Sequence, residues 1–256
     1  DEGDRRKILS CVIIGGGATG VELAVEIIEF MQETLCSYYR ACHLRKEDMQ
    51  VTLVAASQEL LPSFPPELRN IAYRRLIKKG VKVMLNESVK EVQPGKIIFA
   101  DKSFIEAGIT IWVAGVKPTV MEIAGTEKEK NGRIKIDGYL KVNGLSNVYS
   151  LGDVSGTAPM LAQVAVQQGK MVAQNIIASI KNQPPIPFKF NEKGLLVSLG
   201  NWYAVGKIYG IVMKGPVMWW LWRTIYLFNF HSWRKRIKIA VEWTVNLFYP
   251  RDITEI

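Results

Sequence analysis

The order of apolar and polar positions in the first part of the chain predicts a strand, a tight turn and a helix. Residues 8–14 form a short apolar run rich in β-branched side chains, and residues 18 to about 39 are compatible with a long helix. After a polar connection, residues 50–54 form a second apolar run of strand length. Two buried strands joined through a helix lie parallel in one sheet, so the chain is predicted to open with a βαβ unit.

Proline and glycine divide the rest of the chain into shorter elements. A helix is predicted over residues 67–79, between three prolines and Gly80, which is placed to cap it. Short strands forming a small meander that returns to the main sheet are predicted at residues 81–85, 88–92, 96–99 and 110–113. Loops then lead to a helix over residues 160–180, and a proline-rich linker introduces a final region of different composition.

A glycine motif stands where the first strand meets the first helix. The segment GGGATG at residues 15–20 satisfies G-x-G-x-x-G. Its first glycine permits a tight turn, its second lets a pyrophosphate approach the backbone, and its third lets the helix pack on the strand. The free N–H groups of the helix N-terminus favour an anion there. A dinucleotide site is predicted, with the candidate contacts Gly15, Gly16, Gly17, Thr19 and Gly20.

The end of the second strand lacks the carboxylate that usually selects NAD. That segment reads Val-Ala-Ala-Ser-Gln at residues 54–58, and we expect Ala55 to line the cofactor site. An acidic residue here would accept hydrogen bonds from the adenosine ribose hydroxyls. Discrimination against a 2′-phosphate is therefore expected to be weak, which leaves both NADH and NADPH as candidate cofactors.

Glu22 follows the last glycine of the motif by two residues. A carboxylate is favoured near a helix N-terminus, and it is in a position to face the nicotinamide end of a cofactor. The alternative is an ordinary helix-start carboxylate without a functional role.

Four segments occur in an order that resembles the type II NADH dehydrogenases: VIIGGGATGVELA, TIWVAGVKP, VYSLGDVS and AQVAVQQGKMVAQNI. The resemblance covers nearly the whole chain. It implies a Rossmann-like α/β flavoprotein fold with two dinucleotide-binding domains, in which the NADH module is inserted into the FAD module. The family's first glycine fingerprint would precede residue 1, so the chain is expected to be N-terminally truncated with an incomplete FAD domain.

The resemblance also implies roles for residues outside the glycine motif. Ala114 and Gly115 would bring the backbone close to the nicotinamide. Gly152 and Asp153 match the family's Gly-Asp pair, whose carboxylate hydrogen-bonds the ribityl or pyrophosphate part of FAD. A solvent-exposed turn aspartate is the alternative for Asp153.

The predicted helix near residue 160 is expected to serve the other face of the flavin. Gln163 and Gln167 are four residues apart and so lie on one face of the helix. Such a pair is more often solvated, but the AQVAVQQG context favours a quinone site. Ala162 lies in the first turn of this predicted helix, whose N-terminus would stabilise negative charge on a reduced flavin ring.

The C-terminal region combines aromatic and basic residues. The apolar stretch at residues 216–230 is interrupted and falls short of the roughly 20 residues that span a bilayer. From residue 201 onward eight Lys or Arg accompany three acidic residues, and the whole chain carries a net charge of +9. Amphipathic helices lying on an anionic membrane surface are predicted. The alternative is a helix packed in the core or against a second subunit, and nucleic acid fits less well.

The expectations combine into one interpretation of the chain. Residues 1–113 form the NAD(P)H-binding domain, residues 114–183 the C-terminal part of the FAD domain, and residues 184–256 the membrane-anchoring region. The intact enzyme would pass hydride from NADH to FAD and electrons on to quinone without pumping protons. It would lie peripherally on the cytoplasmic face of the cell membrane, and a homodimer is left open.

Two other functions are retained as alternatives. One is a membrane-associated NAD(P)H-binding fragment without flavin or turnover. The other is a sulfide:quinone reductase, which needs two cysteines beside the flavin, whereas Cys11, Cys36 and Cys42 all fall in or near the first βαβ unit. With only two histidines and no C-x-x-C spacing, no zinc site is expected.

Overall fold

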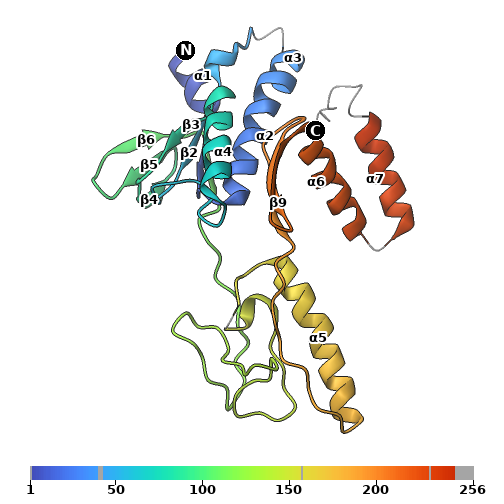
Figure 1. Cartoon of the computed structure of the whole chain (residues 1–256). Helices are drawn as coiled ribbons and strands as arrows, with labels where there is room; N and C mark the ends of the chain where they lie inside the picture. Colours follow the sequence, from blue (N-terminus) through green and yellow to red (C-terminus); the bar gives the residue numbers. More distant parts are fainter. Residues whose placement is uncertain (1, 40–42, 157, 231, 246–256) are drawn as a thin grey trace. The chain divides into compact units, whose positions relative to one another are not determined.

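The computed structural model describes residues 2–39, 43–156, 158–230 and 232–245 (Figure 1). The chain divides into two compact units. The first unit comprises residues 1–115 together with 194–256, and the second comprises residues 116–193. The functions assigned to the three predicted regions stay predictions.

A four-stranded parallel sheet is the centre of the first unit. Its order is β3-β2-β1-β7, with β1 at Ser10–Ile14, β2 at Gln50–Val54, β3 at Lys82–Met84 and β7 at Ile109–Trp112. The helices of this βαβ layer are α2 (Ala18–Glu29), continued by a π-helix (Phe30–Leu35) and α3 (Cys36–Tyr38), and α4 (Pro66–Lys78). The predicted βαβ opening is confirmed. A short helix, α1 (Glu2–Ile8), precedes β1 and was not predicted.

Side chains of the central strands alternate between two cores. Ile13 and Leu53 pack with α2 and α4, whereas Val12, Ile14 and Val54 face the opposite side. That opposite side is covered by a separate antiparallel sheet of β4 (Val89–Gln93), β5 (Lys96–Phe99) and β6 (Phe104–Glu106). Because successive strand residues point to opposite faces, one strand serves both cores. Of the four strands predicted as a meander, the first and last are β3 and β7 of the main sheet, and the middle two are β4 and β5 of the antiparallel sheet.

A second antiparallel sheet packs against the helices of the first unit, where the sequence predicted no strands. It consists of β8 (Gly194–Ser198), β9 (Ala204–Ile208) and β10 (Ile211–Gly215). Val197, Leu199 and Val205 are fully buried in the same core as α2 and α4. The helices α6 (Pro216–Asn229) and α7 (Trp233–Val245) follow it. The first part of the C-terminal region is therefore core structure.

A buried carboxylate fastens this sheet to α2. Glu29 is 4% exposed, its Oε2 accepts the N–H of Asn201 at 2.9 Å, and its other oxygen forms an ion pair with Lys79. Gly200 adjoins this contact with φ +89°, and a Cβ there would lie 2.6 Å from the Glu29 carboxyl carbon. Removing a partner from a buried, paired charge costs several kcal/mol. The turn between β8 and β9 therefore depends on this glycine.

The second unit is smaller and has little regular structure before its helix. Its core consists of Ile134, Ile136, Leu140, Val142, Met171 and Val172. Its main element is α5 (Ala162–Ile180), and a single 3₁₀ turn covers Gly152–Val154. Isolated β-bridges such as Ile136 with Val142 connect the loops, so tertiary packing rather than a sheet holds this unit.

Gly200→Ala should destabilise the protein much more than Gly210→Ala. Both glycines have φ +89°, so both variants carry about 1 kcal/mol of backbone strain. Only the Gly200 variant also displaces Glu29, since nothing lies within 4 Å of a Cβ at Gly210. We expect the Gly200 variant to lose roughly 3 kcal/mol or more in urea unfolding. Equal losses for the two variants would show that the Glu29 contact contributes no stability.

Candidate functional site

The glycine loop lies at the carboxyl end of β1, and close packing explains most of its glycines. A Cβ on Gly15 would lie 2.8 Å from the carbonyl of Val113, and one on Gly16 would lie 2.7 Å from the Cβ of Ala55. A Cβ on Gly20 would overlap the carbonyl oxygen of Gly15. Three of the four glycines are thus required by the fold itself.

Gly17 is different, because no atom lies within 4 Å of the position of its Cβ. It is the N-cap residue of α2 and has extended backbone angles (φ −76°, ψ −176°). No side chain caps the helix, so the N–H groups of its first turn, which includes the exposed Thr19, are left to solvent or a ligand. The geometry gives an open position in front of a positive helix end, which suits a phosphate group.

Three segments meet at this edge of the sheet. The N–H of Gly15 donates to the carbonyl of Val54 at 2.8 Å, and the N–H of Val113 donates to the carbonyl of Ile14 at 2.9 Å. The carboxyl ends of β1, β2 and β7 therefore lie together, as one dinucleotide site formed by these segments requires. In open α/β sheets, ligands bind outside the carboxyl ends of the strands.

The predicted contacts differ in accessibility. Ala114 and Gly115 are exposed, with open space around Gly115. Ala55 is buried, and its N–H and carbonyl are engaged with Met84 and Glu87. The geometry makes Ala55 a packing residue beneath Gly16 rather than a hydrogen-bonding contact.

Residues 54–58 carry no carboxylate, although the backbone N–H of Glu87 donates to the carbonyl of Ala55 and so brings one acidic residue beside the end of β2. Glu59 is the first acidic residue after the strand, and it forms an ion pair with Arg69. The Ser57 hydroxyl donates to the carbonyl of Glu59 at 2.7 Å.

Glu22 contacts the C-terminal sheet. One of its carboxylate oxygens accepts the N–H of Ser198 in β8 at 2.9 Å. Burial raises the pKa of this carboxyl, the Ser198 N–H lowers it, and the charge of Glu26 raises it. The pKa of Tyr226 on α6 is raised mainly by burial of its ring, and the negative charge of Glu22 raises it further. Glu22 thus links the start of α2 to the C-terminal elements, and its predicted role at the nicotinamide stays a prediction.

In the second unit, two side chains hydrogen-bond to the backbone of the Gly152–Asp153 turn. The N–H of Gly152 donates to the Oε1 of Gln168 at 2.6 Å, and Arg133 donates to the carbonyl of Asp153 at 3.0 Å. The Asp153 side chain is exposed. A carboxylate on a braced turn suits hydrogen bonding to ribityl hydroxyls. The sequence pattern did not identify Gln168 or Arg133, although Gln168 belongs to the segment AQVAVQQGKMVAQNI.

The two predicted quinone contacts bind the backbone of the 191–193 segment. Gln167 donates its Nε2 to the carbonyl of Asn191 at 2.9 Å and accepts that residue's N–H at 3.0 Å. Gln163 accepts the N–H of Lys193 at 3.3 Å. Ala162 is exposed at the first turn of α5. The predicted shared face of the helix exists, but its amides already have partners.

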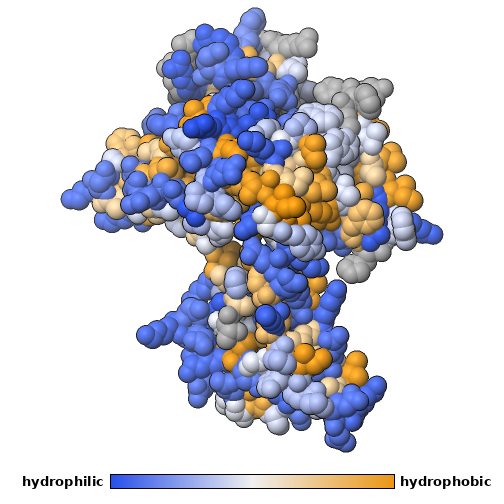
Figure 2. All heavy atoms as spheres, viewed as in Figure 1, coloured by the Kyte–Doolittle hydropathy of each residue, from blue (hydrophilic) through white to orange (hydrophobic). Residues whose placement is uncertain are grey.

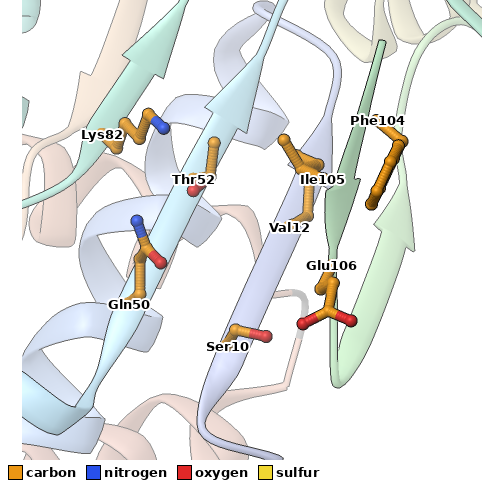
Figure 3. Close-up of a pocket in the computed structure, with 8 residues that line it drawn as sticks. All are labelled: Ser10, Val12, Gln50, Thr52, Lys82, Phe104, Ile105 and Glu106. Atoms are coloured by element: carbon orange, nitrogen blue, oxygen red, sulfur yellow. The ribbon is translucent and has the colours of Figure 1, made fainter. Parts of the chain in front are cut away.

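A hollow of the first unit lies between the first halves of β1 and β2, the start of β3, and the strand β6 (Figure 3). It has a volume of about 540 Å³ and is lined by Ser10, Val12, Gln50, Thr52, Lys82, Phe104, Ile105 and Glu106. Ser10 and Gln50 are the first residues of β1 and β2, whereas the glycine loop follows the last residue of β1. This hollow is therefore not the dinucleotide site.

The described cysteines do not form a redox pair. Cys11 is buried, and burial raises the pKa of its thiol to about 11. Cys36 lies with its sulfur 3.9 Å from that of Met49. Cys42 lies outside the described residues. A thiol with a pKa this high stays protonated at neutral pH, so Cys11 is not a nucleophile.

Comparison with protein families gives a match to the pyridine nucleotide-disulphide oxidoreductase model over residues 2–169. The chain belongs to this family. A second model, the NDH2 C-terminal domain, matches residues 193–252. The resemblance to type II NADH dehydrogenases is thereby confirmed, and the second match covers the sheet β8–β10 with α6 and α7.

Relatives and solved structures agree with this assignment. The chain is 34% identical to an internal alternative NAD(P)H-ubiquinone oxidoreductase A1 of Arabidopsis thaliana, over 100% of this chain and 54% of the relative. It is 33% identical to a type II NADH:quinone oxidoreductase of Haemophilus influenzae, over 84% of this chain and 50% of the relative. The chain spans about half the length of these curated relatives.

A solved structure shows the same fold. The structure of NDH2 from Plasmodium falciparum in complex with NADH superposes with a TM-score of 0.90 at 17% identity, over 100% of this chain and 69% of that one. The predicted α/β fold is thus confirmed.

Replacing Glu22 by Gln should change how stability depends on pH. Because the folded protein raises the pKa of this carboxyl above its ordinary value of 4.5, ionising it costs stability as the pH rises through the higher, folded value. Gln keeps an acceptor for the Ser198 N–H without that cost. In urea unfolding, the free energy of unfolding of the variant should therefore rise relative to that of the wild type between pH 4.5 and neutrality.

Glu22→Leu is the matched control, because it removes the acceptor. It should lose about 1–3 kcal/mol at every pH, since the Ser198 N–H is left without a partner. Parallel pH profiles for the wild type and the Gln variant would contradict the assigned cause.

Proposed function

We propose that this chain is the NAD(P)H-binding and membrane-facing part of an FAD-dependent, non-proton-pumping NADH:quinone oxidoreductase. The open position at Gly17, in front of the uncapped N-terminus of α2, is the observation that carries the proposal. The relatives named as NADH:quinone oxidoreductases support it, as does the NADH complex of the structure with the same fold.

Two residue groups would hold the nicotinamide cofactor. The N–H groups of the first turn of α2 bind its pyrophosphate, and the missing side chain of Gly17 lets the phosphates approach. Ala114 and Gly115 leave room beside the nicotinamide, and Glu22 orders that end. Since residues 54–58 carry no carboxylate, the site is expected to accept NADPH as well as NADH.

The flavin, when bound, accepts hydride and releases electrons singly or in pairs. In this chain Asp153 would accept hydrogen bonds from its ribityl hydroxyls, on a turn that Gln168 and Arg133 hold through its backbone. The start of α5 at Ala162 has no side-chain cap, and its positive end would lie beside developing negative charge. The buried Gln168 amide and Arg133 guanidinium hold the turn that carries the exposed Asp153 carboxylate, and this arrangement suits a ligand with hydroxyl groups.

Gln167 retains bonding capacity for a quinone, and Gln163 lies on the same face of α5. An amide has two N–H donors and an oxygen with two lone pairs. The Gln167 amide uses one N–H and one lone pair on Asn191, so each group can bind a second partner. The segment at residues 191–193 then fixes the orientation of both amides toward the quinone.

The helices α6 and α7 would attach the protein to a membrane surface. None of the described helices combines the length and the apolar character that crossing a bilayer requires. On α7, exposed apolar side chains recur every four residues at Trp233, Ile237, Val241 and Val245. Figure 2 shows apolar atoms on the side of the first unit where Figure 1 shows these helices. Peripheral binding through one helix face is proposed.

Gly17→Ala should separate the nicotinamide step from flavin binding. The protein is incubated with FAD, freed of excess, and mixed with NADH without oxygen, while the visible flavin absorption is followed. The wild type should retain flavin and be bleached. The variant should retain flavin and stability but bleach at least about 10-fold more slowly, because a methyl group occupies the pyrophosphate position.

Gly138→Ala is the control, since it also places a Cβ in open space but is more than 100 residues away in sequence from the glycine loop. Wild-type protein that binds NADH and takes up no flavin would support the alternative of a flavin-free NAD(P)H-binding module. Equal bleaching by wild type and Gly17→Ala would refute the proposed site.

Removing basic residues from α7 should weaken binding to anionic vesicles. Arg234, Lys235 and Lys238 each contribute on the order of 1 kcal/mol near an anionic surface, so changing all three to Gln should weaken binding roughly 100-fold. Sedimentation with phosphatidylglycerol vesicles measures it. Changing the exposed Lys78, Lys82 and Lys90 to Gln removes the same charge elsewhere, and an equal effect would contradict a specific role for α7.

A further inference from the structure

The Gly152–Asp153 turn is held by two buried groups from separate segments. Gln168, on α5, is fully buried and accepts the Gly152 N–H at 2.6 Å. Arg133 is 8% exposed and donates its Nε to the carbonyl of Asp153 at 3.0 Å and its Nη2 to the carbonyl of Ala158 at 2.7 Å. The turn is thus held at the N–H of Gly152 and at the carbonyl of Asp153.

These groups are costly to bury. Among the described residues no ion pair joins Arg133 to a carboxylate, although the side chain of Glu129 packs nearby against Gly156. Three buried polar atoms without a protein hydrogen-bond partner also flank the turn: the hydroxyls of Ser150 and Ser155 and the Nε2 of Gln168. An unpaired buried polar group costs about 1–3 kcal/mol. The hydrogen bonds that Gln168 and Arg133 make to backbone groups offset part of this cost, and they fix the shape of the turn.

A neighbouring amide on the same helix shows what a purely structural role looks like. Asn175 is 1% exposed and lies two turns after Gln168 on the same face of α5. Its Nδ2 donates to the carbonyl of Ile186 at 2.9 Å and its Oδ1 accepts the N–H of the same residue at 2.7 Å. Asn175 fastens the chain after α5, far along the helix from the turn, and leaves no polar atom unpaired.

We propose that Gln168 and Arg133 are positioning residues for the flavin, which hold the Gly152–Asp153 turn so that the Asp153 carboxylate faces the cofactor. This inference rests on the proposed function. Neither residue touches the flavin; each acts through the turn. A turn fixed before binding lowers the entropy that must be lost when the ligand binds.

Four variants test the proposal in the full chain. Gln168→Met removes the acceptor at nearly constant volume, whereas Gln168→Glu keeps an oxygen at the same place. Arg133→Lys keeps the charge but loses the fork that reaches two carbonyls. Asn175→Leu is the control for loss of a buried amide on α5. Amide exchange at Gly152 is measured by NMR, together with the melting temperature and the dissociation constant for FAD.

Gln168→Met should speed exchange at Gly152 and weaken FAD binding about 10-fold, and Gln168→Glu should restore both to near wild type. Arg133→Lys should weaken FAD binding. Asn175→Leu should lower the melting temperature and leave Gly152 exchange and FAD affinity unchanged. Unchanged exchange at Gly152 in Gln168→Met overturns the proposal, as does an equal loss of FAD affinity in Asn175→Leu.

If the wild-type chain takes up no FAD, the flavin part of the proposed function fails for this chain. Exchange at Gly152 then still decides whether Gln168 holds the turn, because it is measured without any ligand. The two failures are thereby distinguished.

Discussion

The contact between Gly20 and the carbonyl of Gly15 is the constraint on which the first unit depends. No side chain fits at Gly20, so the first turn of α2 can pack directly on the loop that precedes it. The same loop leaves no room for a side chain where Gly15 meets the end of β7. This packing fixes the direction of α2, and the N–H groups of its first turn consequently face open space at Gly17.

The helix α2 also carries the contacts that join the C-terminal sheet to this loop. Glu22 and Glu29 are two helical turns apart on one face, and they accept the N–H groups of Ser198 and Asn201. The sheet continues directly into α6 and α7. A single helix thus connects the predicted cofactor loop, through two carboxylates, to the elements proposed to lie on the membrane. Binding at the loop and attachment at the surface share one rigid support.

Local patterns predicted the βαβ unit and the glycine loop, because the residues that determine them are neighbours in sequence. The sheet β8–β10 was missed because glycines interrupt its alternation and its aromatic and basic neighbours suggested a membrane segment. The role of Glu29 depends on a partner 172 residues away, which no local pattern reveals. Helical spacing selected Gln163 and Gln167 correctly as one face, but it carries no information on burial, which distinguishes Gln168.

Amide hydrogen exchange with and without NADH tests the central claim most directly, because it locates the dinucleotide without requiring flavin or quinone. We predict that NADH slows exchange in residues 15–22 and 113–115 and leaves the starts of β1, β2 and β3 unchanged. Protection at Ser10, Gln50 and Lys82 around the hollow, or no protection at the glycine loop, would contradict the account.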